Sequence, residues 1–245
     1  MYAFTYERPA TAADAQKLAQ AGGKLLAGGQ TLLASMKLRL AAPEQLVDLA
    51  GIADLKGIRR EAGTLTIGAM TRHCDVAESA EVRAMGTIGG SVANNDPAAD
   101  YPAALMALGA TVHTGTRQIK ADDFFQGLFA TALEDGELIT AIGLPIPKRA
   151  AYVKFVQPAS RFALIGVFVA QLGDGSVRVA VTGGGNGVFR HAGMEAALGK
   201  QFSPDAVAGV KTDKAEMSSD LHGSAAYRAH LVGVMTQRAV AQALA

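Results

Sequence analysis

The chain has 245 residues, of which 49% are hydrophobic and 18% charged, and its formal net charge is +1. This balance is typical of a folded globular chain of one or two domains and excludes an intrinsically disordered one. No basic excess indicates nucleic-acid binding, and no apolar run reaches the roughly 20 residues of a membrane span. The first residues lack the basic and apolar regions of a signal peptide, so we expect a cytoplasmic protein.

The N-terminal part of the chain alternates short strands with helices. Thr11, with Asp14 three residues on, is typical of a helix N-cap, and Gly22-Gly23 ends that helix. Strands are expected over 2–6, 24–27, 45–49, 55–58, 64–68, 111–114, 118–120 and 137–144. Helices are expected over 12–19, 72–79 and 97–108.

The sequence changes in character after a proline-rich linker, Pro145 to Arg149. Three strands are expected beyond it, with Gly173-Asp174-Gly175 as the turn between the last two. They cover 152–156, 163–171 and 176–182, and two helices follow over 190–198 and from 225 onward.

A first glycine-rich stretch follows the strand over 24–27 and leads into a helix-like run. It comprises Ala27, Gly28, Gly29, Gln30 and Thr31. Glycine has no Cβ, so its backbone turns sharply and comes close to a ligand. Successive N–H groups in such a turn form a concave nest that suits phosphate, and the N-terminus of the following helix adds to it. The G-x-G-x-x-G dinucleotide fingerprint is absent from the chain.

A second stretch repeats the pattern of a Gly-Gly pair followed by a small polar residue. It comprises Thr87, Ile88, Gly89, Gly90 and Ser91. Two nests in one chain would hold the two halves of a pyrophosphate. The alternative is that both stretches are ordinary turns, and that is the usual explanation of a lone Gly-Gly pair. A third cluster, Thr182 to Gly187, is expected to be a loop at the end of a strand, because Gly-Asn-Gly favours a turn by itself.

Longer strings around the two stretches are far more specific. AGGQTLLASMKLRL and GTIGGSVANNDPAADYPAA resemble the FAD-binding subunits of the molybdenum hydroxylases, known as the medium subunit or flavin domain of carbon monoxide and xanthine dehydrogenases. The resemblance extends over nearly the whole chain. It includes FTYERPATAADA, TIGAMTRHCDVAES, IKADDFFQGLFATALEDGELITAIGLPIP and SDLHGSAAYRAHLVGVMTQRAV, in the family's order.

The resemblance implies the vanillyl-alcohol oxidase-type (PCMH-like) FAD-binding fold. Two α+β subdomains, about 1–53 and 54–147, form the FAD-binding domain 1–147. A C-terminal α+β domain, 148–245, packs a three-stranded antiparallel sheet against helices.

The resemblance also implies which residues bind FAD, and it implies no catalytic residue and no metal ligand in this chain. The two glycine stretches wrap the pyrophosphate. Asp96 and Asp100 lie in the Asn-Asn-Asp-Pro-Ala-Ala-Asp phrase, and Asp100 matches an acid that binds polar atoms of the cofactor. Lys154 matches a lysine near the flavin, and Phe162 lies where relatives carry an aromatic or acidic residue. From the residues alone, Asp100 is equally well explained as a solvated acid at a helix N-terminus, and Lys154 better as a surface lysine.

One departure from the family lies before the second stretch. Relatives carry an additional segment there with a Gln-x-Arg phrase, whereas Ala77 to Met85 runs almost directly into Gly86. Either the deletion is real, and the affinity for FAD is in doubt, or residues are missing from the sequence and the numbering has been closed up. We favour the second explanation, since a true loss would remove part of the core beside the second stretch.

Three functions follow from these observations. The favoured one is an electron-transfer subunit whose FAD takes electrons from partner iron–sulfur clusters and passes them to NAD, a quinone or oxygen. The alternatives are a self-contained FAD-dependent oxidase or dehydrogenase, for which little chain is left to build a substrate domain, and a redox-inactive nucleotide-binding module.

The cysteine and histidine content bears on the partners. The single cysteine, Cys74, supplies neither a disulfide nor the thiolates of an iron–sulfur cluster, and the five histidines lack metal-ligand spacing. Iron–sulfur clusters and a molybdenum cofactor are therefore expected in a small and a large partner subunit, in a dimer of heterotrimers.

Overall fold

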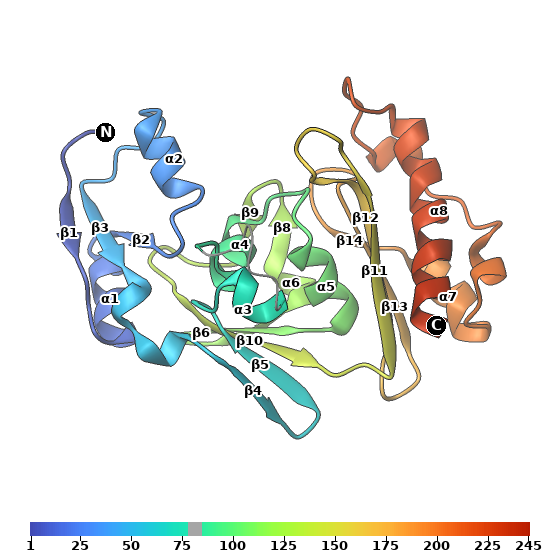
Figure 1. The fold of residues 1–245 in the computed structure, drawn as a ribbon, viewed down its shortest axis with the longest axis horizontal. Coiled ribbons are helices and arrows are strands. Elements are labelled where there is room, and N and C mark those ends of the chain that lie inside the picture. The colour runs from blue at the N-terminus through green and yellow to red at the C-terminus, as the bar shows by residue number, and fades with distance from the viewer. Residues whose placement is uncertain (78–84) are drawn as a thin grey trace. The chain divides into compact units, whose positions relative to one another are not determined.

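The structure is a computed structural model that describes residues 1–77 and 85–245 (Figure 1). Contacts between Cα atoms divide the chain into two compact units. The first comprises Met1–Ala93, Thr111–Ile119 and Ala132–Gly143. The second comprises Asn94–Ala110, Lys120–Thr131 and Leu144–Ala245. The first unit therefore lies wholly before the expected domain boundary at residues 147/148, whereas the second draws on both sides of it. Each unit is described by itself below.

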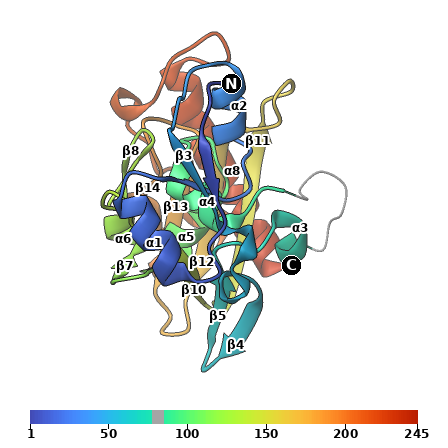
Figure 2. The same cartoon turned by 90° about the vertical axis from the view of Figure 1, so that its left-hand side faces the viewer.

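The first unit begins with a small parallel sheet and a helix that packs on it (Figures 1 and 2). The strand order is β1 (Thr5–Glu7), β3 (Gln45–Asp48) and β2 (Lys24–Leu26). Helix α1 (Ala12–Gln20) is capped as expected, since the Thr11 hydroxyl accepts a hydrogen bond from the N–H of Asp14 at 3.1 Å. A buried apolar cluster that includes Ala15 and Val47 joins this helix to the sheet.

A five-stranded sheet completes most of the first unit. Its strand order is β4 (Ile58–Glu61), β5 (Thr64–Gly68), β10 (Ile139–Pro145), β6 (Thr111–Thr114) and β7 (Gln118–Lys120). The helices of this unit are short: α2 (Leu32–Lys37), the 3-10 turns η1 (Leu49–Gly51) and η2 (Ala53–Leu55), α3 (His73–Ala77) and α4 (Ile88–Asn94).

Several expected elements are shifted or differ in kind. The expected strand 55–58 is not formed: Leu55 ends the turn η2, residues 56 and 57 belong to no helix or strand, and β4 begins only at Ile58. The expected helix 97–108 begins at Tyr101, because Pro97 to Asp100 form a loop. The expected helix 72–79 is described from His73 to Ala77, and its last two residues lie outside the described residues.

The second unit is built on an antiparallel sheet of β11 (Arg149–Val156), β12 (Ala163–Gln171), β13 (Val177–Thr182) and β14 (Phe189–Arg190). The three strands expected from the sequence form its body, and the two-residue β14 extends its edge. Its helices are α5 (Tyr101–Leu108), α6 (Ala121–Phe124), α7 (Ala192–Lys200) and α8 (Ala225–Leu244). It also holds a hairpin of β8 (Phe125–Gly127) and β9 (Ala130–Thr131), and the turns η3 (Pro204–Val207) and η4 (Lys214–Glu216).

The two faces of this sheet have different roles, because successive side chains of a strand point to opposite sides. Ile165, Val167 and Val169 of β12 join the buried cluster shared with α7 and α8. Residues of even number, such as Gly166 and Thr182, which are paired across β12 and β13, point to the opposite face. Helix α5 packs on that second face (Figure 1).

No helix in the described ranges 1–77 and 85–245 has both the length and the apolar character needed to span a bilayer.

A buried carboxylate stabilises the first unit between β6 and β10. Arg117 donates two hydrogen bonds to Glu137, from Nε to Oε1 at 2.9 Å and from Nη2 to Oε2 at 2.8 Å. The side chain of Glu137 is 4% exposed and also accepts a hydrogen bond from the N–H of Glu134. The Arg117 hydrogen bonds, helped by that N–H, lower the pKa of Glu137 to about 2 against the cost of burial.

We expect Glu137→Gln to lower the free energy of unfolding at pH 7 by about 2 kcal/mol, because it removes the charged partner of Arg117. The folded pKa is depressed, so this stabilisation is present above pH 4.5 and is lost as pH falls toward 2. Urea unfolding at a series of pH values measures it, and the variant should lose this part of the pH dependence. Glu134→Gln is the control, since Glu134 contacts the same arginine at 3.5 Å but is 78% exposed. Equal effects of the two variants would contradict the assignment.

Candidate functional site

The expected site residues divide between the two units. The two glycine stretches lie in the first unit, and Asp96, Asp100, Lys154 and Phe162 lie in the second. Each group is therefore considered within its own unit.

The first stretch is a loop that offers unpaired N–H groups. It connects the end of β2 to the start of α2. Within the described part of the chain, no protein acceptor receives the N–H of Gly28, Gly29, Gln30 or Thr31. Gly29 has φ +72°, a conformation that side chains with a Cβ rarely adopt. Consecutive N–H groups left free in a turn are the donor arrangement that suits an anion.

The second stretch is not a turn, contrary to the sequence-based expectation. Ile88, Gly89, Gly90 and Ser91 form the first turns of α4. The N–H groups of Ile88 and Gly89 donate to Thr71 O at 3.1 Å and Ala69 O at 2.9 Å, and Ser91 donates to Thr87 O. The N–H of Gly90 is only weakly engaged and lies 3.3 Å from the hydroxyl of Thr87. This stretch therefore offers fewer donors than the first.

Position 89 requires glycine because of close packing, and not because the backbone forms a turn there. A Cβ at this position would lie 2.6 Å from the Cβ of Ala69 and 2.7 Å from its carbonyl oxygen. The absence of a Cβ at Gly89 therefore allows α4 to lie close to the segment after β5. A Gly-Gly pair in the sequence is compatible both with close helix packing and with a ligand-binding turn, so the pair alone does not separate the two.

The two stretches nevertheless lie together within the first unit. A Cβ built on Gly90 would be 3.6 Å from the Cβ of Ala27. A Cβ built on Gly28 would overlap the carbonyl oxygen of Met85, just before the second stretch. The first loop and the start of α4 therefore border one place on the surface of this unit, as the sequence-based hypothesis requires.

In the second unit, a carboxylate joins a tyrosine and a lysine. Asp100 accepts a hydrogen bond from Tyr152 Oη at 2.6 Å and another from Lys154 Nζ at 2.8 Å. Asp100 directly precedes α5, but its side chain makes no capping hydrogen bond and instead contacts Tyr152 and Lys154. Lys154 is 27% exposed and ion-paired, which differs from a solvated surface lysine. Burial, together with the charge and hydrogen bond of Asp100, raises the pKa of Tyr152 far above its ordinary value.

The loop that carries Asp96 and Asp100 is held by buried polar side chains. The Thr182 hydroxyl lies 2.7 Å from Pro97 O and 2.8 Å from Ala99 O, and its single proton is shared between these two acceptors. Asp96 accepts a hydrogen bond from the N–H of Ala98, which tightens the loop from within.

Asn95 starts this loop and fastens it to the β8–β9 hairpin. It is fully buried, and its Nδ2 donates to Gly127 O at 2.8 Å and Ala130 O at 2.7 Å. It has φ +44°, which asparagine tolerates better than most residues. Its Oδ1 meets no donor among the described residues.

Phe162 stands apart from these contacts. It directly precedes β12, its side chain is 50% exposed, and its N–H donates to the hydroxyl of Ser160. The structure brings Asp100 and Lys154 together, and no hydrogen bond joins either of them to Phe162 in the described part of the chain.

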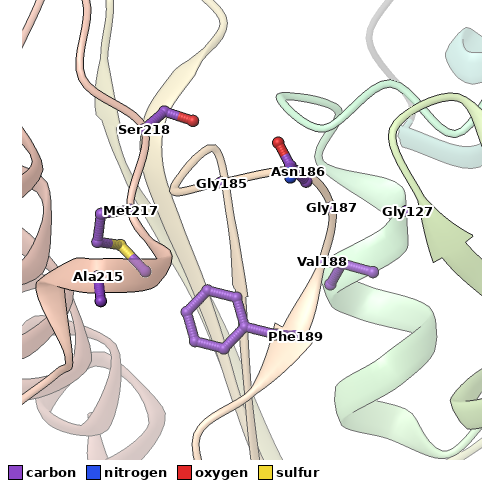
Figure 3. A pocket seen from close by; sticks show the side chains of 9 residues that line it. All are labelled: Gly127, Gly185, Asn186, Gly187, Val188, Phe189, Ala215, Met217 and Ser218. Carbon is purple, nitrogen blue, oxygen red and sulfur yellow. The ribbon is translucent and has the colours of Figure 1, made fainter.

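The third glycine cluster borders a separate pocket in the second unit, with a volume of about 460 Å³ (Figure 3). In Figure 3 the ring of Phe189 points toward Met217, between the loop of Gly185 to Val188 and the segment of Ala215 to Ser218. Gly127 also lines it. Residues 183–188 form no helix or strand after β13 ends at Thr182, which confirms the expected loop at a strand end.

Sequence analysis missed Tyr152, Asn95 and Thr182. Tyr152 carried a usable signal, because it is two residues from Lys154 on the same expected strand and therefore shares its face. Asn95 and Thr182 carried none, since their partners lie 32 or more residues away in the chain.

Comparison with known families matches residues 2–147 to the FAD binding domain in molybdopterin dehydrogenase. Residues 150–243 match the CO dehydrogenase flavoprotein C-terminal domain. The carbon monoxide dehydrogenase medium chain of Afipia carboxidovorans is 37% identical, covering 99% of this chain and 97% of the relative. The glyceraldehyde dehydrogenase medium chain of Sulfolobus acidocaldarius is 32% identical, covering 96% of each. Among solved structures, reconstituted CO dehydrogenase from Oligotropha carboxidovorans contains a chain that is 34% identical, with a TM-score of 0.88 and 99% of each chain covered.

These alignments bear on the shortened stretch before Gly86. The alignment to the Afipia medium chain spans 279 residues, more than the 245 of this chain. That extra length is consistent with a shortening of this chain, and our preference for omitted residues over a true deletion stays a prediction. Residues 78–84 themselves lie outside the described residues.

We expect Asn95→Ala to lower the free energy of unfolding by about 2–3 kcal/mol, since it removes both hydrogen bonds to the hairpin and places alanine at a positive φ. Asn95→Gly should lower the free energy of unfolding by less, because glycine adopts a positive φ without strain. The difference in free energy between the two variants measures the backbone strain of alanine at this position. Urea unfolding compares both variants with Asn94→Ala, the partly exposed neighbour. An unchanged stability in Asn95→Ala would contradict the anchoring role.

Proposed function

Since this chain belongs to the family of FAD-binding medium subunits of molybdenum hydroxylases, it is an oxidoreductase subunit whose cofactor is FAD, and we propose that its first glycine loop binds the pyrophosphate of that FAD. The flavin then relays electrons from partner subunits to an external acceptor. The observation that carries the assignment is the run of free N–H groups from Gly28 to Thr31.

The residues present fit a pyrophosphate. The free N–H groups supply donors, and Gly29 supplies a turn that a larger residue would strain. The start of α4 adds the N–H of Gly90 and the hydroxyl of Thr87. We therefore assign both stretches to the pyrophosphate, with the first as the main donor and the second as a smaller contribution than its glycine content suggested.

The remaining cofactor residues belong to the second unit, and their assignment rests on the family resemblance. A carboxylate has about four lone-pair sites, so Asp100 keeps acceptor capacity beyond its bonds to Tyr152 and Lys154. Its side chain is 45% exposed, which leaves that capacity accessible to cofactor hydroxyls. Lys154 supplies a positive charge, and Asp96 and Phe162 complete the proposed set.

Bound FAD supplies the ability to accept electrons singly and release them in pairs, so this chain needs no nucleophile or general base of its own. Its residues hold the cofactor and set its electrostatic surroundings. No catalytic residue is therefore assigned.

The relatives are medium chains of multi-subunit enzymes, so partner subunits are implied. We propose a small iron–sulfur subunit and a large molybdenum-cofactor subunit, arranged as a dimer of heterotrimers in the cytoplasm. The single cysteine supports this arrangement, because the metal centres require ligands from other chains. We also keep a domain boundary near residues 147/148, with subdomains 1–53 and 54–147.

The first test is the visible spectrum of the purified chain with added FAD, before and after dithionite. We expect flavin absorption bands that are retained through gel filtration and bleach on reduction. Substrate added to the chain alone should leave these bands unchanged, whereas substrate added together with the partner subunits should bleach them. That pair of results would exclude a self-contained oxidase. Absence of bound flavin in the assembled complex would leave the redox-inactive module as the better description.

The second test is Gly29→Ala, which should raise the Kd of FAD about tenfold or more through strain at positive φ and crowding of Leu33. Gly63→Ala is the matched control, because Gly63 has φ +79° but no atom within 4 Å of an added Cβ. Both variants carry the same backbone strain, so fluorescence titration with FAD separates a local effect from loss of stability. Equal losses of affinity would argue against the loop.

A further inference from the structure

Tyr152 and Lys154 hold the two oxygens of one carboxylate. Tyr152 Oη donates to Oδ1 of Asp100 and Lys154 Nζ donates to Oδ2. A carboxylate held at both oxygens cannot rotate without breaking one of the bonds. The orientation of Asp100, and with it the place of the Lys154 ammonium, therefore depends on the tyrosine hydroxyl.

The tyrosine is itself fixed by the sheet. Its ring stacks on Phe168, the residue directly opposite on β12, with centroids 6.1 Å apart and ring planes at 26°. Gly166 lies opposite Lys154, and a Cβ there would overlap the hydroxyl of Tyr152. The same Cβ would lie 2.8 Å from Cγ2 of Thr182. The hydroxyl thus occupies space that a side chain at 166 would take.

The hydroxyl of Tyr152 stays protonated, as a hydrogen-bond donor to Asp100 must. Burial and the charge of Asp100 raise its pKa, so the hydroxyl remains a donor across the range in which the protein is folded. A neutral donor fixes the carboxylate without neutralising it, which leaves the negative charge to hold Lys154.

We propose that Tyr152 is a positioning residue for the cofactor contacts of this subunit, acting through Asp100 on the ammonium group of Lys154. The proposal rests on the proposed function, in which Asp100 and Lys154 bind FAD. Tyr152 itself need not touch the cofactor.

The first experiment needs no FAD. The full chain is treated with an acetylating reagent, and mass spectrometry compares the rate at Lys154 with that at the exposed Lys148. Loss of the Tyr152 hydrogen bond in Tyr152→Phe should raise the rate at Lys154 about fivefold, the factor that corresponds to one hydrogen bond, and leave Lys148 unchanged. Tyr227→Phe is the matched control, because the hydroxyl of Tyr227 has no partner in the described part of the chain.

The second experiment is a double-mutant cycle with FAD as the ligand. Lys154→Met should raise the Kd of FAD, and Tyr152→Phe should raise it to a smaller extent. If Tyr152 acts through Lys154, the double variant should bind FAD no more weakly than Lys154→Met alone. Urea unfolding of each variant shows whether a loss of affinity merely reflects loss of stability.

The outcomes separate the two proposals. An unchanged Kd in Lys154→Met would remove Lys154 from the proposed cofactor site, whereas the acetylation rate would still test the role of Tyr152. Additive effects in the double variant, or an acetylation rate at Lys154 that does not change in Tyr152→Phe, would overturn the positioning role.

Discussion

The loop from Asn95 to Asp100 is the constraint on which the polar face of the second unit depends. It has no helix or strand of its own, so its backbone and side chains need partners elsewhere. Thr182 meets the carbonyls of Pro97 and Ala99, and the N–H of Gly183 donates to Pro97 O at 2.8 Å. Asn95 fastens the start of the loop and Tyr152 its end. With both ends held, helix α5 begins at a fixed place.

The sheet makes this anchoring possible because its strands serve both faces. The odd residues of β12, such as Val167, lie in the apolar cluster with α7 and α8. The even residues on the other face, Gly166 and Phe168 among them, shape the surroundings of Tyr152. The same three strands therefore provide the apolar core of the unit and the scaffold of its polar contacts, and a register shift of one residue would lose both at once.

The parts of the fold that were predictable from the sequence are those set by local pattern. The strands 152–156, 163–171 and 176–182 were recognisable because alternation and turn chemistry are local, and Thr11 was recognisable as a cap for the same reason. The paired glycines at 89–90 predicted a turn but lie in helix α4, because glycine serves close helix packing as well as turns. The anchoring roles of Asn95 and Thr182 could not be predicted from the sequence, because a buried hydrogen bond between residues far apart in the chain produces no local sequence pattern.

The position of α8 in the chain has a consequence for biosynthesis. On the ribosome, β12 and β13 are complete by residue 182, whereas the helix that covers their apolar face begins only at Ala225. α5, on the opposite face, is made earlier. During synthesis the nascent sheet therefore acquires its polar-face partner first, while a stripe of valine and isoleucine stays uncovered until α7 and α8 emerge. Transiently exposed apolar surface of this kind promotes aggregation, so the time between residue 182 and the end of α8 is the interval in which the chain is most exposed to it.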